Sequence, residues 1–238
     1  MKSGLATAGR IDDRVKIAIF GGTFDPIHSG HMQAAKAAAR HLHLNKVLFV
    51  PTGCPPHKTS NGLADYHHRL AMVALACAED SRFVPSMLES PELHTGPHYS
   101  VDTIRRAKRM LKPGDQLYFL IGLDALLDLR HWKQFRHLLD ITDFIVVSRP
   151  GFETHEVEKA LPRDMIDNRR PRTNSRQIHL RRTTVYILPD VEVPVASTGL
   201  RSAIQQKQSI TGLVPPKVEQ YILKEGLYKV AHQLRGGK

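Results

Sequence analysis

The sequence predicts a single-domain α/β fold, in which a doubly wound parallel sheet is flanked by helices. Three observations support this prediction. An apolar run at 15–20 ends at a glycine pair, a helix-forming stretch follows it, and short apolar runs then alternate with helical patterns along most of the chain. Strands that alternate with helices are typical of a parallel sheet with right-handed crossovers.

The first βαβ unit is predicted from two apolar runs, 15–20 and 46–50, and from the alanine-rich stretch 32–42 between them. The first run stops at the glycines 21–22 and the second at Pro51, as expected of buried strands that enter loops. A unit of this kind places its two strands side by side and parallel.

The rest of the chain continues the same alternation. Further strands are predicted at 116–121, 141–147 and 184–188, and further helices at 66–78, 100–110 and 216–225. The last helix has Pro216 at its start and Gly226 just past its end, where these residues are favoured. The pattern is typical of a Rossmann-like sheet with helices on both faces.

Two stretches do not follow this pattern. Residues 153–182 contain seven arginines and few apolar residues. Apart from a helical start at 156–161, we interpret this stretch as a basic surface insertion within a domain that spans 15–230. Residues 1–14 are polar and lack the apolar core of a secretory signal, so we interpret them as a flexible N-terminal tail.

Composition narrows the class of protein. The chain has 34 Lys and Arg against 23 Asp and Glu, a formal charge of +11, which favours anionic partners such as nucleotides, nucleic acid or acidic lipid. No apolar run reaches the ~18 residues that a membrane span needs. Cys54 and Cys77 lack the spacing of a metal finger and are expected to be free thiols. We therefore expect a cytoplasmic protein without a membrane partner.

The segment 21–31 has features suited to binding phosphate. Its two glycines let the backbone approach a ligand closely, and a helix begins near Gly30, so that free amides face the same crevice. His28 and His31 stand at the helix entrance and can donate hydrogen bonds to phosphate oxygens. Phosphoryl-type transfer needs mainly such positioning and charge stabilisation. The segment lacks the Gly-Lys-Ser/Thr ending of a P-loop and the spacing of a dinucleotide-binding loop.

This segment resembles the signature of the nucleotidyltransferase superfamily that has a His-x-Gly-His motif. Further segments, in order along the chain, are similar to motifs of bacterial nicotinate-nucleotide adenylyltransferases. They are Pro-Pro-His-Lys at 55–58, His-Tyr-Ser-Val-Asp-Thr-Ile at 98–104, Ile-Gly-Leu-Asp at 121–124 with Trp132, Ser-Arg-Pro-Gly at 148–151 and Ala-Ser-Thr-Gly-Leu-Arg at 196–201. The ordered set, from about residue 15 to about residue 228, is more specific than the first motif alone.

The resemblance implies that ATP and nicotinate mononucleotide react to give nicotinate adenine dinucleotide and pyrophosphate, a step of NAD biosynthesis. The residues implied to act on the phosphates are His28, His31, Lys58 and Arg201. Those implied to bind ATP are Gly21, Gly22, Thr23, Phe24, Ser197 and Thr198. Those implied to bind the mononucleotide are Tyr99, Thr103, Asp124 and Trp132. Mg²⁺ would bridge oxygens of the ATP phosphates without a metal site on the protein.

Structural interpretations of some of these residues stay open. Trp132 could be a core or hinge residue, Asp124 could cap a helix, and Tyr99 and Thr103 lie four apart and could be core contacts. Two further positions depart from the family pattern, because Ala196 and His98 each stand where Ser is usual.

Other functions stay open as well. A related adenylyl- or cytidylyltransferase could use another acceptor, such as nicotinamide mononucleotide or pantetheine phosphate. A nucleic-acid-binding protein is less favoured, because the sequence has no helix-turn-helix, RNA-recognition or zinc-finger signature and few aromatic residues to stack on bases. The sequence does not fix the oligomeric state, and a homo-oligomer is one arrangement that it permits.

Overall fold

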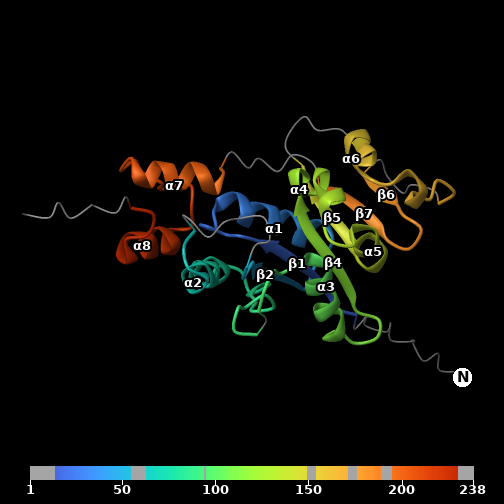
Figure 1. Cartoon of the computed structure of the whole chain (residues 1–238), viewed down its shortest axis with the longest axis horizontal. Coiled ribbons are helices and arrows are strands. Elements are labelled where there is room, and N and C mark those ends of the chain that lie inside the picture. The colour runs from blue at the N-terminus through green and yellow to red at the C-terminus, as the bar shows by residue number, and fades with distance from the viewer. Residues whose placement is uncertain are drawn as a thin grey trace, which may run out of the picture.

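The centre of the molecule is a seven-stranded sheet in the order β3-β2-β1-β4-β5-β7-β6 (Figure 1). The structure, a computed structural model, describes residues 14–54, 63–93, 95–148, 154–170, 176–188 and 195–229. The strands are β1 Lys16–Gly22, β2 Lys46–Pro51, β3 Phe83–Pro85, β4 Gln116–Gly122, β5 Asp143–Val147, β6 Gln177–His179 and β7 Thr184–Leu188. The strands β1 to β5 and β7 are parallel to one another, and the edge strand β6 runs antiparallel to β7.

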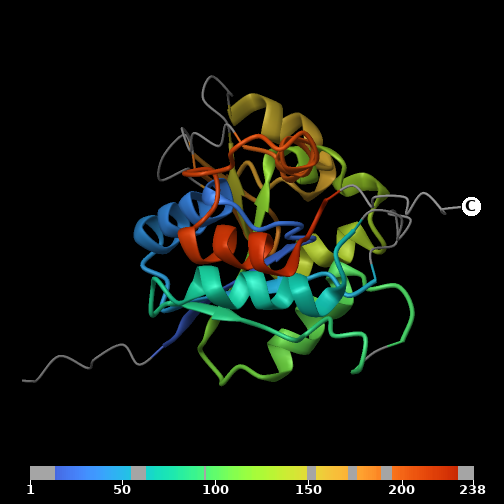
Figure 2. The same cartoon turned by 90° about the vertical axis from the view of Figure 1, so that its left-hand side faces the viewer.

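Helices cover both faces of this sheet. They are α1 Ser29–His41, α2 Tyr66–Cys77, α3 Ser100–Arg109, α4 Leu123–Leu127, α5 Phe135–Ile141, α6 Thr154–Ala160, α7 Ser197–Gln205 and α8 Pro216–Glu225. Neighbouring residues of β1 point to opposite faces: Ala18 and Phe20 join one apolar cluster, with α1, α2 and α8, whereas Ile19 joins the other, with α3 to α6. On the first face α8 packs along α2 (Figure 2). The predicted doubly wound α/β fold is confirmed.

The predicted strand at 141–147 begins too early. Ile141 is the last residue of α5, and β5 starts at Asp143. Thr142 separates the two elements with an extended backbone, and its hydroxyl donates to the carbonyl of Leu117 over 3.0 Å. A short helix that ends directly before a strand leaves no turn residue to mark the boundary.

The description of 153–182 as a surface insertion is wrong for the parts that the structure describes. The helical start predicted at 156–161 overlaps α6, whereas β6, which was not predicted, extends the sheet. Five apolar side chains from this stretch are buried in the core: Val157, Leu161, Met165, Ile178 and Leu180. The described arginines, at 163, 169, 170, 176, 181 and 182, are exposed. The few apolar residues are spaced to cover one face, which the arginine-rich composition obscures.

Two parts of the chain for which the sequence made predictions, residues 1–13 of the tail and Arg172, lie outside the described residues. None of the helices in the described ranges is long and apolar enough to cross a membrane.

Candidate active site

A cavity of about 630 Å³ opens where β1 and β4 end. The chain leaves β1 toward β2 on one side and later returns to β4 on the other, so the crevice lies at the point where the strand order reverses, where open α/β sheets bind ligands. The predicted residues that line it are Gly21, Gly22, Thr23, Tyr99, Thr103, Asp124 and Trp132. Phe24 and the other predicted residues that the structure describes do not line the cavity. They lie in or contact the continuation of the same loop: His28, His31, Ser197, Thr198 and Arg201.

His28 and His31 form a reciprocal cap at the start of α1. The backbone N–H of His31 donates to Nδ1 of His28 over 3.4 Å, and the backbone N–H of His28 donates to Nδ1 of His31 over 3.3 Å. The rings stack with centroids 3.7 Å apart. Because both Nδ1 atoms accept hydrogen bonds, the neutral rings carry their proton on Nε2. Each histidine therefore keeps an Nε2–H donor available for a phosphate oxygen.

Burial keeps this pair neutral. Desolvation lowers the pKa of His28 to about 4 and holds the pKa of His31 well below its ordinary value, with a smaller contribution from the neighbouring His28 charge. Protonation would also convert each Nδ1 into a donor and break the reciprocal cap. The pair is thus arranged to donate hydrogen bonds at neutral pH without carrying positive charge.

Folding stability should therefore fall as the pH drops from 6.5 toward 4. Unfolded His28 binds a proton near pH 6.5 but folded His28 only near pH 4, so the unfolded state binds more protons in between. The contribution, about 3 kcal/mol for this shift, is fully present above pH 6.5 and is lost as the pH falls. Urea unfolding at pH 7 and pH 5 measures the part of it that is lost between those two values, about 2 kcal/mol. His28→Asn should reduce the difference between the two pH values, and an unchanged difference would contradict this assignment.

Phe24 does not line the cavity with its side chain. Its ring is 1% exposed and makes edge contacts with His31, at 5.0 Å between centroids, and with Phe20. Phe24 has a left-handed backbone, with φ of 50°. The carbonyl of the preceding Thr23 accepts a hydrogen bond from Arg69, so the Phe24 amide points the opposite way across the planar peptide. Phe24 therefore supports His31 with its ring and leaves its amide as the group for a ligand.

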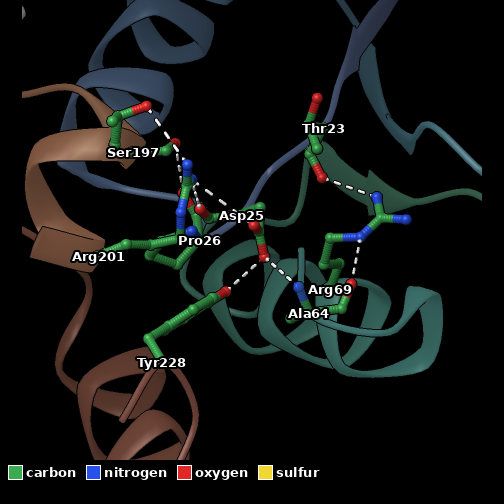
Figure 3. A network of polar contacts seen from close by, with 9 residues as sticks. Thr23, Asp25, Pro26, Ala64, Arg69, Ser197, Arg201 and Tyr228 are labelled. Carbon is green, nitrogen blue, oxygen red and sulfur yellow. Dashed lines mark hydrogen bonds and ion pairs between the residues drawn. The ribbon is translucent and has the colours of Figure 1, made fainter. Parts of the chain in front are cut away.

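Helix α7 is tied to the same loop from the other end of the sequence (Figure 3). The Ser197 hydroxyl donates to the carbonyl of Pro26 over 3.0 Å, and Nη1 of Arg201 donates to the carbonyl of Asp25 over 2.7 Å. Nη2 of Arg201 also lies 3.4 Å from the Thr198 hydroxyl. Ala196 precedes the helix and supplies no side-chain cap. Because of the Ser-to-Ala departure, the N-cap residue of α7 makes no side-chain hydrogen bond to the first amides of the helix.

Asp25 is a buried carboxylate that sequence reasoning missed, although it lies inside the motif. It is 1% exposed, and its Oδ1 accepts from the Tyr228 hydroxyl over 2.7 Å and from the Ala64 amide over 3.1 Å. Arg69, 2% exposed on α2, donates to the carbonyls of Ala64 and Thr23. These contacts hold the loop from beneath, as Figure 3 shows. The partners are far apart in sequence, which is why a local pattern could not reveal them.

Glu89 is a second missed residue, on the wall of the cavity. It is 6% exposed and accepts a hydrogen bond from the Thr103 hydroxyl over 2.6 Å. Burial raises its pKa, and the hydrogen bond from Thr103 and the nearby Arg106 oppose the rise. Thr103 is therefore held in place by Glu89 while it lines the cavity. The sequence offered no local signal for Glu89, because its role arises from a contact with Thr103 on another element.

Trp132 and Asp124 also line the cavity. The Trp132 ring packs at a tilt against Phe119, with centroids 6.2 Å apart, and its Nε1 donates to Asp128 over 3.4 Å. Trp132 thus combines packing with a face on the cavity. Asp124 lies in the first turn of α4, whose N-cap is Gly122 with no side-chain cap bond, so the capping alternative is not supported.

Gly53 packs closely against the backbone of Glu89 and the ring of His98. A Cβ at Gly53 would overlap the carbonyl oxygen of Glu89 and lie 2.9 Å from Cε1 of His98. His98 in turn accepts the Cys54 amide on Nδ1 over 3.0 Å and donates its own amide to the Cys54 carbonyl over 3.2 Å. The His98 departure from the family pattern therefore has a structural role, because it binds the backbone at residue 54.

Gly53→Ala should lower both the melting temperature and kcat/KM, the latter at least about tenfold, because an overpacked contact costs about 1–3 kcal/mol and here displaces the cavity wall. Thermal unfolding and steady-state kinetics check this expectation. Gly122→Ala is the matched control for stability, since no heavy atom lies within 4 Å of its added Cβ. Equal melting temperatures for the two variants would contradict the prediction.

Lys58 lies outside the described residues, so its predicted role stays a prediction. The remaining predicted site residues occupy two adjoining regions that share the loop 21–31. One is the cavity, and the other is the histidine–α7 cluster, which consists of His28, His31, Ser197, Thr198 and Arg201. The cavity is an open, partly aromatic pocket, and the other region offers hydrogen-bond donors and a guanidinium group. The arrangement suits a ligand with an aromatic ring at one end and phosphates at the other.

Comparison of the sequence with known proteins gives a consistent result. Residues 19–202 match the family described as cytidylyltransferase-like. The chain is similar to a Solibacter usitatus protein named "Probable nicotinate-nucleotide adenylyltransferase", at 39% identity over 214 residues that cover 90% of this chain and 100% of the relative. A Moorella thermoacetica protein with the same name is 37% identical over 217 residues, covering 90% of this chain and 92% of the relative.

Solved structures agree on the fold. Nicotinic acid mononucleotide adenylyltransferase of Plasmodium falciparum, in complex with NaAD, aligns with a TM-score of 0.69 at 21% identity. The alignment covers 90% of this chain and 98% of that one. At this identity the likeness supports the shared architecture.

Proposed function

The chain belongs to the nicotinate-nucleotide adenylyltransferases, within the cytidylyltransferase-like proteins, and from this premise we propose that it transfers the adenylyl group of ATP to nicotinate mononucleotide. The products are nicotinate adenine dinucleotide and pyrophosphate. The observation that carries the proposal is the dual position of the loop 21–31, whose glycines line the cavity and whose histidines stand at the start of α1.

In this reaction a 5′-phosphate oxygen of the mononucleotide attacks the α-phosphorus of ATP. A new P–O bond forms, the bond from the α-phosphorus to the bridging oxygen breaks, and pyrophosphate leaves with the bonding electrons. No protein nucleophile is needed, because the acceptor supplies its own phosphate. Catalysis then depends on alignment of the two substrates and on donors placed where charge develops.

The phosphates are proposed to lie against the histidine pair and α7. His28 and His31 donate from Nε2–H, and Arg201 neutralises charge that develops on pyrophosphate. Ser197 and Thr198 lie in the first turn of α7, where amide groups and the helix dipole favour an anion. Lys58 is proposed as a second cation for pyrophosphate.

The mononucleotide is proposed to occupy the cavity. Trp132 offers a ring face for the pyridine, and Tyr99 and Thr103, at the start of α3, also line the cavity. Asp124 helps organise the crevice between the two substrates. The cavity volume of about 630 Å³ lies within the usual range for sites that bind small molecules.

We propose that Mg²⁺ accompanies ATP, bound by phosphate oxygens, and offsets part of the triphosphate charge. Among the residues that the structure describes, no group of three or more His, Cys, Asp or Glu side chains is placed to hold a metal ion. We also propose that the reaction takes place in the cytoplasm, where ATP is available and where free thiols such as Cys54 and Cys77 persist.

A substrate panel tests the proposal. The protein is incubated with ATP and Mg²⁺ plus nicotinate mononucleotide, nicotinamide mononucleotide or pantetheine phosphate, and pyrophosphate and the adenylylated product are quantified. The highest kcat/KM is expected with nicotinate mononucleotide. A higher value with either other acceptor would assign the enzyme to a different substrate, and no turnover with any of them would overturn the proposal.

A further inference from the structure

Tyr228 reaches the motif loop from the opposite end of the chain. It follows α8, and its hydroxyl donates to Oδ1 of Asp25 over 2.7 Å, across 203 residues of sequence (Figure 3). Burial and the neighbouring Asp25 carboxylate raise the pKa of Tyr228, so the phenol stays protonated and acts as a donor at neutral pH. None of the motifs found in the sequence includes this residue.

The backbone at Tyr228 is unusual. Its φ of 64° lies in the left-handed region, which a residue with a Cβ adopts at a cost. Such conformations persist where the surrounding structure requires them, and they cluster at functional sites. Here the turn after Gly226 directs the tyrosine hydroxyl to a buried carboxylate in the loop that carries both histidines.

The two carboxylate oxygens of Asp25 have different partners. Oδ1 is occupied by two neutral donors, the Tyr228 hydroxyl and the Ala64 amide. Oδ2 lies 3.6 Å from Nη1 of Arg201 and has no hydrogen bond within the described part of the chain. A charge-assisted bond would measure about 2.7–2.9 Å. Arg201 instead donates from Nη1 to the backbone carbonyl of Asp25, so its ion pair with the carboxylate is incomplete.

We infer that Tyr228 is a positioning residue for Arg201. By holding Oδ1, it prevents the Asp25 carboxylate from turning into a full salt bridge with the guanidinium group. Asp25 then orients Arg201 through its backbone carbonyl and leaves the guanidinium charge available to pyrophosphate. This inference rests on the proposed function in one respect, the role given to Arg201.

The first test is Tyr228→Phe, which removes the hydroxyl and keeps the ring. It should lower kcat about tenfold, with little change in the KM of nicotinate mononucleotide, because only the pyrophosphate side is disturbed. Tyr221→Phe is the matched control: it lies on α8 and loses a hydroxyl contact to His68, 2.9 Å away, that does not reach Asp25. Equal kcat values for Tyr228→Phe and the wild type would overturn the inference.

A double-mutant cycle separates positioning from general structural damage. In an Arg201→Ala background, Tyr228→Phe should have no further effect on kcat, because the group that it positions is gone. The same tenfold loss in both backgrounds would overturn the inference.

Pyrophosphate binding provides a readout that does not depend on the acceptor. The rise in melting temperature caused by pyrophosphate, taken against each variant's own ligand-free value, should be smaller for Tyr228→Phe than for Tyr221→Phe and the wild type. Equal rises in melting temperature would overturn the positioning role of Tyr228. A wild-type enzyme that binds pyrophosphate but turns over no acceptor would instead overturn the proposed function alone.

Discussion

Replacing His31 by alanine should lower kcat about a hundredfold to a thousandfold while the dissociation constant of ATP changes much less. The reciprocal cap with His28 fixes the His31 ring. We propose that its Nε2–H donates to charge that grows in the transition state, and such donors act more on turnover than on substrate binding. Steady-state kinetics and equilibrium binding of ATP measure the two effects separately.

The control for this prediction is His41→Ala, an exposed histidine in the last turn of the same helix. It removes an imidazole from α1 without touching the cap, so its kcat should match the wild type. The His31 variant also loses the acceptor for the His28 amide, and its kinetics should therefore be measured well below its melting temperature. Equal losses in kcat and in ATP affinity would contradict the assignment of His31 as a donor that acts mainly in the transition state.

The second large effect concerns the buried side chain of Arg69 and the stability of the fold. Arg69→Met should lower the free energy of unfolding by about 3–5 kcal/mol, because breaking a buried charged contact leaves its partners uncompensated. The carbonyls of Thr23 and Ala64 would lose their donor, and the Asp25 carboxylate would lose a nearby positive charge. Urea unfolding at pH 7 measures the change.

Arg82→Met is a suitable comparison. Arg82 pairs with Asp80 over 2.7 Å, but about a third of its side chain is exposed, and exposed ion pairs contribute only about 0–1 kcal/mol. The Arg69 variant should therefore be the less stable of the two by a wide margin. A comparable loss in both variants would show that the contacts of Arg69 with the loop do not hold it in place.

Elements with clear end signals could be predicted from the sequence. The helix at 216–225 has the predicted bounds, because Pro216 and Gly226 mark its two ends. The elements β3, α4 and α5 were not predicted. The strand β3 has only three residues, and the helices α4 and α5, with five and seven residues, are shorter than two full helical turns. The arginine-rich composition of 153–182 favoured the wrong prediction of a surface insertion. In the described part of this stretch, exposed arginines outnumber the buried apolar residues that pack α6 and β6 into the core.

The residues of the candidate site also divide into those that the sequence predicted and those that it did not. The loop 21–31 could be recognised because glycines and histidines stand at fixed spacing, and the structure places Tyr99 and Trp132 around the adjoining cavity. Asp25, Glu89 and Tyr228 escaped notice because their roles arise from contacts between distant segments. A buried carboxylate looks like any other acidic residue until the fold shows that water is excluded from it.

The same sheet has consequences for how the protein behaves at high concentration. Both of its outer strands, β3 and β6, are only three residues long. An outer strand offers free amides and carbonyls that can recruit a strand from another molecule, and short strands flanked by charge or proline resist such recruitment. Pro85 ends β3, and exposed arginines at 176, 181 and 182 flank β6. We therefore expect these exposed arginines to disfavour pairing of β6 with a strand of another molecule.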